Sequence, residues 1–140
     1  MKSGFRHLGR TLVLKAIFWY EVHPGSGVDF ILDYLLNNDE GKFLPDESFT
    51  KTTFLGVVAK LGEIDPIIVE YAPSWPLDKI AKVDLAILRL GIYELLFNED
   101  VPTLVAINEA VELAKEFGDK SSSQFVNGVL SGLAKSRDLL

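Results

Sequence analysis

The chain has 140 residues, of which 48% are hydrophobic and 24% charged, a composition that is sufficient to bury a core and argues against intrinsic disorder. It contains no cysteine, which excludes disulfides, cysteine nucleophiles and thiolate metal sites. The formal net charge of -6 argues against a non-specific nucleic-acid binder. This charge is uneven, because residues 1–20 contain four lysines or arginines and no acid, whereas residues 21–140 contain ten basic and twenty acidic side chains.

Turn residues divide the N-terminal half of the chain into helices. Apolar periodicity predicts a first helix over residues 5–22, closed by the turn residues 23–27, and a second helix over residues 28–36. A third helix is expected to begin at Pro45-Asp46, where the carboxylate of Asp46 can cap free backbone amides. Asp65-Pro66 resembles an N-cap followed by proline at the first helical position, which predicts a fourth helix that ends before Pro73.

The clearest internal boundary lies at Pro73–Pro76, where Trp75 is expected to plug the junction between two halves. Residues 77–97 are apolar nearly all round, which is typical of a helix at the centre of an all-helical domain. A further helix is ended by Gly118, and the serines 121–123 are expected to supply a capping hydroxyl for the last one. The sequence therefore predicts an all-α fold of about seven helices in two packed groups sharing one core. We expect a single domain, 1–140, with an N-terminal subdomain of about 1–73 and a C-terminal subdomain of about 77–140.

Side chains suited to catalysis or metal binding are sparse. His7 and His23 lack a second ligand at metal-binding spacing, and the serine run is more typical of a helix cap than of a nucleophile. We therefore expect a binding module with no catalytic residue, metal, cofactor or small-molecule substrate. Arg89 and Glu94 interrupt the most apolar segment, so no membrane span is predicted and a cytoplasmic location is expected.

The first helix carries two stripes of side chains. A helical wheel places on one side a set suited to a core: Phe5, Leu8, Leu12, Ala16 and Trp19. The opposite side mixes basic and apolar groups: His7, Arg10, Leu14, Phe18 and Glu21, with Arg6 close by. Basic groups can hold phosphates, and aromatic groups can stack on unpaired bases or fill a pocket of a partner. The alternative is a helix buried on both faces, and the pattern leaves both interpretations open.

Specific strings in the C-terminal half resemble a known family. They are VAINEAVELAK at residues 105–115, FG at 117–118 and FVNGVL at 125–130, together with Val83-Asp84, Leu88-Arg89 and YEL at 93–95. These strings closely resemble the NusB transcription antitermination factor family. The resemblance extends more weakly to Arg10, Ala16 and Gly56, and it covers essentially the whole chain.

The resemblance implies an all-helical protein of two three-helix bundles that binds boxA RNA in nascent ribosomal RNA. It also implies a protein partner, the small-ribosomal-subunit protein NusE, and a place in the elongating RNA polymerase complex. The RNA-binding residues expected from the matching N-terminus, the basic cluster and the matching loop are Lys2, Arg6, His7, Arg10, Lys15, Lys120 and Ser121. The expected partner residues are Leu14, Phe18 and Asp84.

Two alternatives accompany this expectation. A helical adaptor that binds only protein is favoured by the net charge and by His7 and Leu8, which stand where many family members have further arginines. The same domain occurs at the front of RNA cytosine methyltransferases, but these need a cysteine nucleophile, which this sequence lacks. Asn108 and Asn127 are interpreted as structural, with amides that join helices through buried hydrogen bonds.

Overall fold

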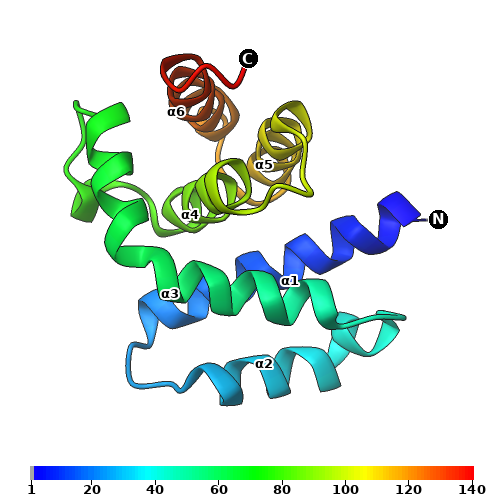
Figure 1. Ribbon diagram of the computed structural model, residues 1–140. Helices are drawn as coiled ribbons and strands as arrows, with labels where there is room; N and C mark the ends of the chain where they lie inside the picture. The colour runs from blue at the N-terminus through cyan, green and yellow to red at the C-terminus, as the bar shows by residue number, and fades with distance from the viewer. Residues whose placement is uncertain (1) are drawn as a thin grey trace. The chain divides into compact units, whose positions relative to one another are not determined.

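The computed structural model describes the backbone of residues 2–140 and the side chains of residues 4–38 and 41–140 (Figure 1). Its α-helices are α1 (Lys2–Val22), α2 (Val28–Asn37), α3 (Ser48–Tyr71), α4 (Lys82–Phe97), α5 (Thr103–Phe117) and α6 (Ser122–Ser136). Two short 3-10 helices, η1 (Asp39–Phe43) and η2 (Leu77–Lys79), precede α3 and α4. The described residues contain no strand, so the predicted all-α fold is confirmed.

The predicted third and fourth helices form one continuous helix, α3, and the prediction of a helix start at Asp65-Pro66 is wrong. Pro66 lies inside this helix, where it cannot donate a hydrogen bond to the carbonyl of Gly62 one turn earlier. Gly62 and Pro66 are both exposed, so water can hydrogen-bond that carbonyl in place of the missing donor. This merger is why the described chain has six α-helices where about seven were expected.

The chain divides into two compact units, residues 1–59 and 60–140, and the division falls within α3, before the expected boundary at residues 73–76. Contacts inside the second unit explain this position. The guanidinium of Arg89 on α4 binds the carboxylate of Asp65, and the hydroxyl groups of Tyr71 and Ser136 are 2.5 Å apart. The second half of α3 is thereby tied to α4 and α6, and Pro73–Pro76 becomes a turn within the second unit.

The first unit consists of α1, α2, η1 and the first half of α3. Its core is made of aliphatic side chains and one phenylalanine: Leu12, Val13, Ala16, Ile17, Ile31, Leu32, Leu36, Phe54 and Val57. The ring of Trp19 on α1 meets Tyr34 of α2 edge-on, with ring centroids 5.3 Å apart. At the other end of α1, the hydroxyl of Thr50 on α3 donates a hydrogen bond of 3.2 Å to the backbone carbonyl of Gly9.

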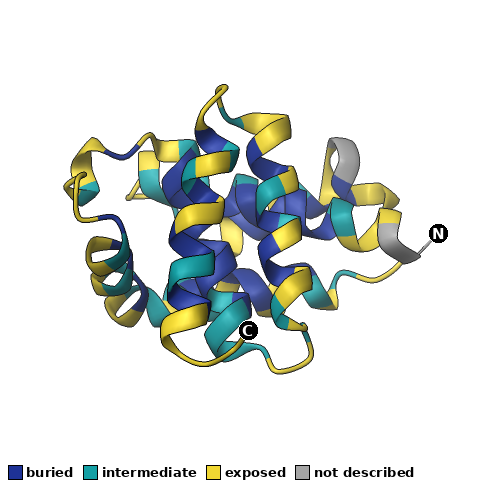
Figure 2. Ribbon diagram, turned by 90° about the horizontal axis from the view of Figure 1, so that it is seen from above, coloured by how far each residue is buried: buried dark blue, intermediate teal, exposed yellow. Residues whose placement is uncertain are grey.

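The second unit has α4 at its centre, in contact with α5 and α6. All residues of α4 from Asp84 to Ile92 are buried, which confirms the expectation for an apolar segment without a solvated face. The other helices of this unit show buried residues on one side and exposed residues on the other, as Figure 2 illustrates by colour. Within the described residues, no helix is long and apolar enough to cross a membrane.

Candidate nucleic-acid and partner interface

The basic side chains expected to bind RNA are not equally accessible. Arg6 is exposed and places its guanidinium 4.2 Å from the centroid of the Phe49 ring. Arg10 lies 5.3 Å from the same centroid but is only 4% exposed. His7 and Lys15 are partly buried, and the side chain of Lys2 lies outside the described residues. Of the two N-terminal arginines, therefore, Arg6 is the one that can reach a phosphate in solution.

The expectation of an exposed second stripe on α1 is wrong in the middle of the helix. Leu14 is 4% exposed, so a side chain assigned to the protein partner is buried together with Arg10. Residues 12–14 and 16–17 are all buried, and Lys15 between them is partly buried, so both stripes of the helix are covered here. The alternative of a helix buried on both faces holds here. Phe18, one turn later, is half-buried and keeps part of its ring accessible.

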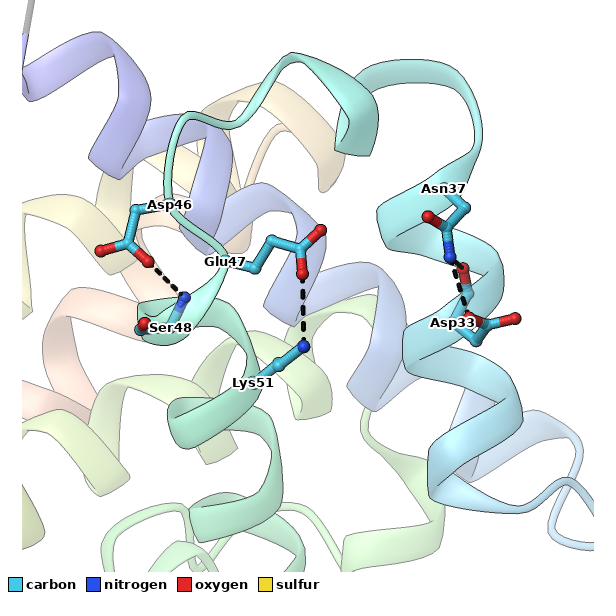
Figure 3. A network of polar contacts seen from close by, with 6 residues as sticks. All are labelled: Asp33, Asn37, Asp46, Glu47, Ser48 and Lys51. Atoms are coloured by element: carbon cyan, nitrogen blue, oxygen red, sulfur yellow. Dashed lines mark hydrogen bonds and ion pairs between the residues drawn. The ribbon is translucent and has the colours of Figure 1, made fainter.

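A groove in the first unit lies between the start of α1 and the segment that leads into α3. It has a volume of about 560 Å³, and its lining includes Phe5, Arg6, Asp46 and Phe49. Figure 3 shows Asp46 beside the first turn of α3, where its Oδ1 accepts a hydrogen bond of 2.9 Å from the backbone N–H of Ser48. This confirms the expected capping contact at Asp46. The backbone N–H and the hydroxyl of Ser48, and then the charge of Arg6, hold the pKa of Asp46 below its ordinary value.

A second cavity, of about 550 Å³, lies in the second unit and brings Asp84 together with Ser121. Asp84 is 9% exposed, and its Oδ1 has no hydrogen-bond partner among the described residues. Burial raises the pKa of Asp84, a hydrogen bond from Ser122 opposes the increase, and the charge of Asp119 adds to it.

The turn before α6 is held by a carboxylate. Asp119 Oδ1 accepts hydrogen bonds from the backbone N–H and the hydroxyl of Ser121, at 2.9 and 3.0 Å. The backbone N–H of Asp119 in turn donates to the hydroxyl of Ser122. The expected serine cap is therefore corrected, because Ser121 at the N-cap position makes no side-chain capping bond. Lys120 is exposed in this turn.

Sequence reasoning missed part of this second cavity. Trp75 is 54% exposed and lines it with Phe125, so Trp75 is not the expected buried plug.

Asn108 and Asn127 are also exposed, and the expectation of buried amide hydrogen bonds is wrong. The hydroxyl of Ser131 donates to Oδ1 of Asn127 along α6. The sequence did contain a signal for the two asparagines, because polar side chains on a helix with a clear apolar stripe are expected on its solvent-facing side.

Known proteins resemble this chain over nearly its whole length. The sequence pattern of the NusB family matches residues 7–135. The transcription antitermination protein NusB of Geobacter sulfurreducens is 38% identical over 133 residues, which cover 95% of this chain and 96% of that protein. The protein of the same name from Agathobacter rectalis is 41% identical over 130 residues, covering 89% and 95%.

Solved structures show the same fold. The structure of T. maritima NusB matches with a TM-score of 0.83 and 36% identity, over 93% of this chain and 90% of that chain. A crystal structure of the antitermination factors NusB and NusE in complex with dsRNA contains a chain that matches with a TM-score of 0.80 at 23% identity, over 94% and 97%. The match in sequence and fold extends through both compact units, from α1 to α6. The chain therefore belongs to the NusB family.

Proposed function

We infer that the protein is a transcription antitermination factor that binds boxA-type RNA in nascent ribosomal RNA and joins the elongating RNA polymerase complex. It acts as a heterodimer with the small-ribosomal-subunit protein NusE. The observation that carries this inference is family membership over residues 7–135, with relatives named for transcription antitermination that are about as long as this chain. A relative of the same fold is also known together with NusE and dsRNA.

The proposed RNA contacts begin at Arg6, whose guanidinium is exposed on α1. Lys15 supplies further positive charge on the same helix, His7 adds a polar ring, and Lys2 extends the cluster toward the N-terminus. Lys120 and Ser121 contribute from the turn before α6. Because residues 21–140 carry an excess of acidic groups, RNA should be repelled from most of the remaining surface. We therefore propose weak RNA binding by the chain alone and stronger binding in the complex with NusE.

The proposed protein contacts use Phe18 and Asp84. Phe18 offers an accessible part of an aromatic ring, the kind of group that anchors interfaces, and the buried Leu14 precedes it by one helical turn. Asp84 lines the cavity that also contains Ser121, and a basic side chain of the partner is proposed to pair with it there. Arg10 is buried and is proposed to position Phe49 and Arg6 rather than to contact RNA directly.

A mobility-shift titration tests the proposed function. The chain is titrated against boxA RNA and against a scrambled RNA of equal length, with and without NusE. We expect the complex to bind boxA more tightly than either the chain alone or the scrambled control. If the chain bound NusE normally but neither bound RNA nor raised the RNA affinity of NusE, this would instead support the second candidate, a helical adaptor that binds only protein. The net charge of -6 and the burial of Arg10 are the observations that favour that candidate.

A further inference from the structure

The groove in the first unit combines an aromatic floor with two opposite charges. Phe5 lines the groove and is 45% exposed, and the guanidinium of Arg6 lies over the ring of Phe49. Asp46 lines the same groove from the segment before α3. A volume of about 560 Å³ falls in the range of small-molecule sites and is ample for one nucleobase. The groove therefore offers stacking surfaces, a cation and an acceptor within one site.

The helices that form this groove are fixed by a close approach of α1 to α3. Gly9 has no side chain, and a Cβ atom there would lie 3.1 Å from Cδ2 of Phe49. The hydrogen bond from Thr50 to the carbonyl of Gly9 holds the same two helices together. The ring of Phe49 is thus close both to the backbone of α1 at Gly9 and to the guanidinium of Arg6. The floor of the groove is already built in the free protein.

The charges select the chemistry of the occupant. Asp46 stays ionised at neutral pH, because its pKa lies below the ordinary carboxyl value. An ionised carboxylate only accepts hydrogen bonds, so it repels phosphate and carbonyl oxygens and attracts N–H donors. Arg6 attracts phosphate and can stack on a planar ring. A planar group with N–H donors, attached to a phosphate backbone, satisfies both residues at once.

We propose that this groove binds one unpaired, amino-bearing base (adenine, cytosine or guanine) of the RNA strand whose phosphate contacts Arg6. Uracil is disfavoured because its one free N–H lies between two carbonyl oxygens, which the carboxylate of Asp46 repels. The base stacks against Phe5 and the guanidinium, and its amino group donates a hydrogen bond to Asp46. This inference rests on the proposed RNA binding and adds base selectivity at one position. The basic charge of residues 1–20 attracts an anionic ligand, and Asp46 requires N–H donors from the same ligand. RNA meets both requirements, which favours it over an acidic or neutral protein segment as the occupant.

The test uses the complex with NusE and a set of boxA-type RNAs in which each position in turn is abasic. One position should cost about tenfold in affinity when its base is missing, which is the typical effect of losing one stacked base. Placing uracil at that position should cost the wild-type complex a similar factor. Asp46→Asn should bring the affinities for uracil and the amino-bearing base within about twofold of each other, since an amide also donates to uracil carbonyls.

Matched variants keep the interpretation clear. The asparagine can still accept the hydrogen bond from Ser48, so α3 should begin where it does in the wild type. Asp29→Asn makes the same charge change at an exposed position on α2 and should retain wild-type discrimination. Phe5→Ala, at an exposed position, should lose about tenfold against the intact RNA and nothing against the RNA that is abasic at the selected position.

Three outcomes would overturn the proposal in distinguishable ways. Unchanged base discrimination in Asp46→Asn, with boxA binding intact, would overturn the groove assignment and leave the proposed function standing. Loss of NusE binding in Asp46→Asn or Phe5→Ala would show that the groove holds a protein segment. Failure of the wild-type complex to prefer boxA over scrambled RNA would remove the proposed function and the groove assignment together.

Discussion

Arg89 binds Asp65 through two parallel hydrogen bonds, from Nε and one terminal nitrogen of the guanidinium to the two carboxylate oxygens, each 2.9 Å long. The side chain of Arg89 is 6% exposed and that of Asp65 is 25% exposed, so this ion pair is largely withdrawn from water. It connects the centre of α4 to the second half of α3. A buried pair of this kind matters most when one partner is lost, because the remaining charge stays desolvated.

Asp65→Asn should therefore lower the free energy of unfolding by about 2 kcal/mol, since a neutral amide removes the negative charge that Asp65 places beside the buried guanidinium. Chemical denaturation at neutral pH measures this change. Asp78→Asn, an exposed carboxylate in η2, is the matched control and should change stability by less than about 0.5 kcal/mol. Equal effects of the two substitutions would mean that the ion pair contributes nothing specific.

The sequence was sufficient to predict the helical class and most helix ends, because those depend on local chemistry. Gly118 follows the end of α5 as expected, and the apolar run in α4 correctly indicated burial on all sides. Pro66 was misleading, because a proline after aspartate is typical of a helix start. Here an exposed face of α3 tolerates the missing hydrogen bond.

The candidate site was less predictable, since its parts come together only in three dimensions. A helical wheel could not decide whether Arg10 and Leu14 face solvent, because a helix with two apolar stripes can be enclosed on both. Asp46 and Phe49 are distant from Arg6 in sequence and lack any motif that joins them. Asp84 and Ser121 were named only through the family resemblance, and the cavity they share forms only when α4 and the turn before α6 come together in the fold.

Gly118→Ala should destabilise the second unit by about 1–3 kcal/mol. A Cβ at this position would lie 2.4 Å from Cβ of Ser122, which is 1% exposed and cannot move away without breaking its hydrogen bond with Asp119. Gly128→Ala is the control, because no neighbouring atom lies within 4 Å of its Cβ and α6 should gain about 0.5–1 kcal/mol. Denaturant titration of both variants checks the opposite signs, and a stabilised Gly118→Ala would contradict the close contact.

Asp84→Asn should become more stabilising as the pH rises. The folded pKa of Asp84 is raised above its ordinary value of 3.8, so the stability that protonation provides is fully present below 3.8 and lost as the pH passes the folded value. At neutral pH the variant avoids a buried charge and should therefore be more stable than the wild type. Unfolding free energies of wild type and Asp84→Asn between pH 3.5 and 7.5 measure the difference. A pH-independent difference would show that the carboxylate of Asp84 is solvated in the folded state.

Asp119→Asn should change the unfolding free energy at neutral pH in the opposite direction to Asp84→Asn. Hydrogen bonds from the backbone and hydroxyl of Ser121 lower the pKa of Asp119, so its contribution is present above 3.8 and lost in acid. The variant should therefore be less stable than wild type at neutral pH, with a deficit that shrinks on acidification.

Phe18→Ala should weaken NusE binding by roughly thirtyfold, because truncation of an aromatic anchor typically costs about 2 kcal/mol of binding free energy. The ring is half-buried, so part of its area is available to a partner. Calorimetric titration gives the affinity, and thermal unfolding reports the fold. Phe43→Ala, at a 67% exposed position in η1, is the matched control and should bind normally. A lower melting temperature with normal binding would place Phe18 in the core.

Arg6→Ala and Arg10→Ala should separate charge from packing. Three to four phosphate contacts to a single strand predict a slope of about -2 to -3 for the logarithm of RNA affinity against the logarithm of salt concentration, and loss of one contact should flatten it by about 0.7. Arg6 is exposed, so Arg6→Ala should flatten the slope and leave stability within about 0.5 kcal/mol of wild type. Arg10 is buried over Phe49, so Arg10→Ala should keep the slope and lose about 1–2 kcal/mol of stability.

Salt titrations of the NusE complex with boxA RNA, paired with denaturant titrations of the free variants, measure both quantities on the same proteins. Lys51 is an exposed lysine on α3 that pairs with Glu47, the residue before that helix (Figure 3). Lys51→Ala controls for the loss of a positive charge away from the N-terminus and should change neither slope nor stability appreciably. If Arg10→Ala flattened the slope as much as Arg6→Ala, its guanidinium would have to reach a phosphate when RNA binds. The start of α1 would then have to rearrange on binding, because at 4% exposure Arg10 is covered in the free protein.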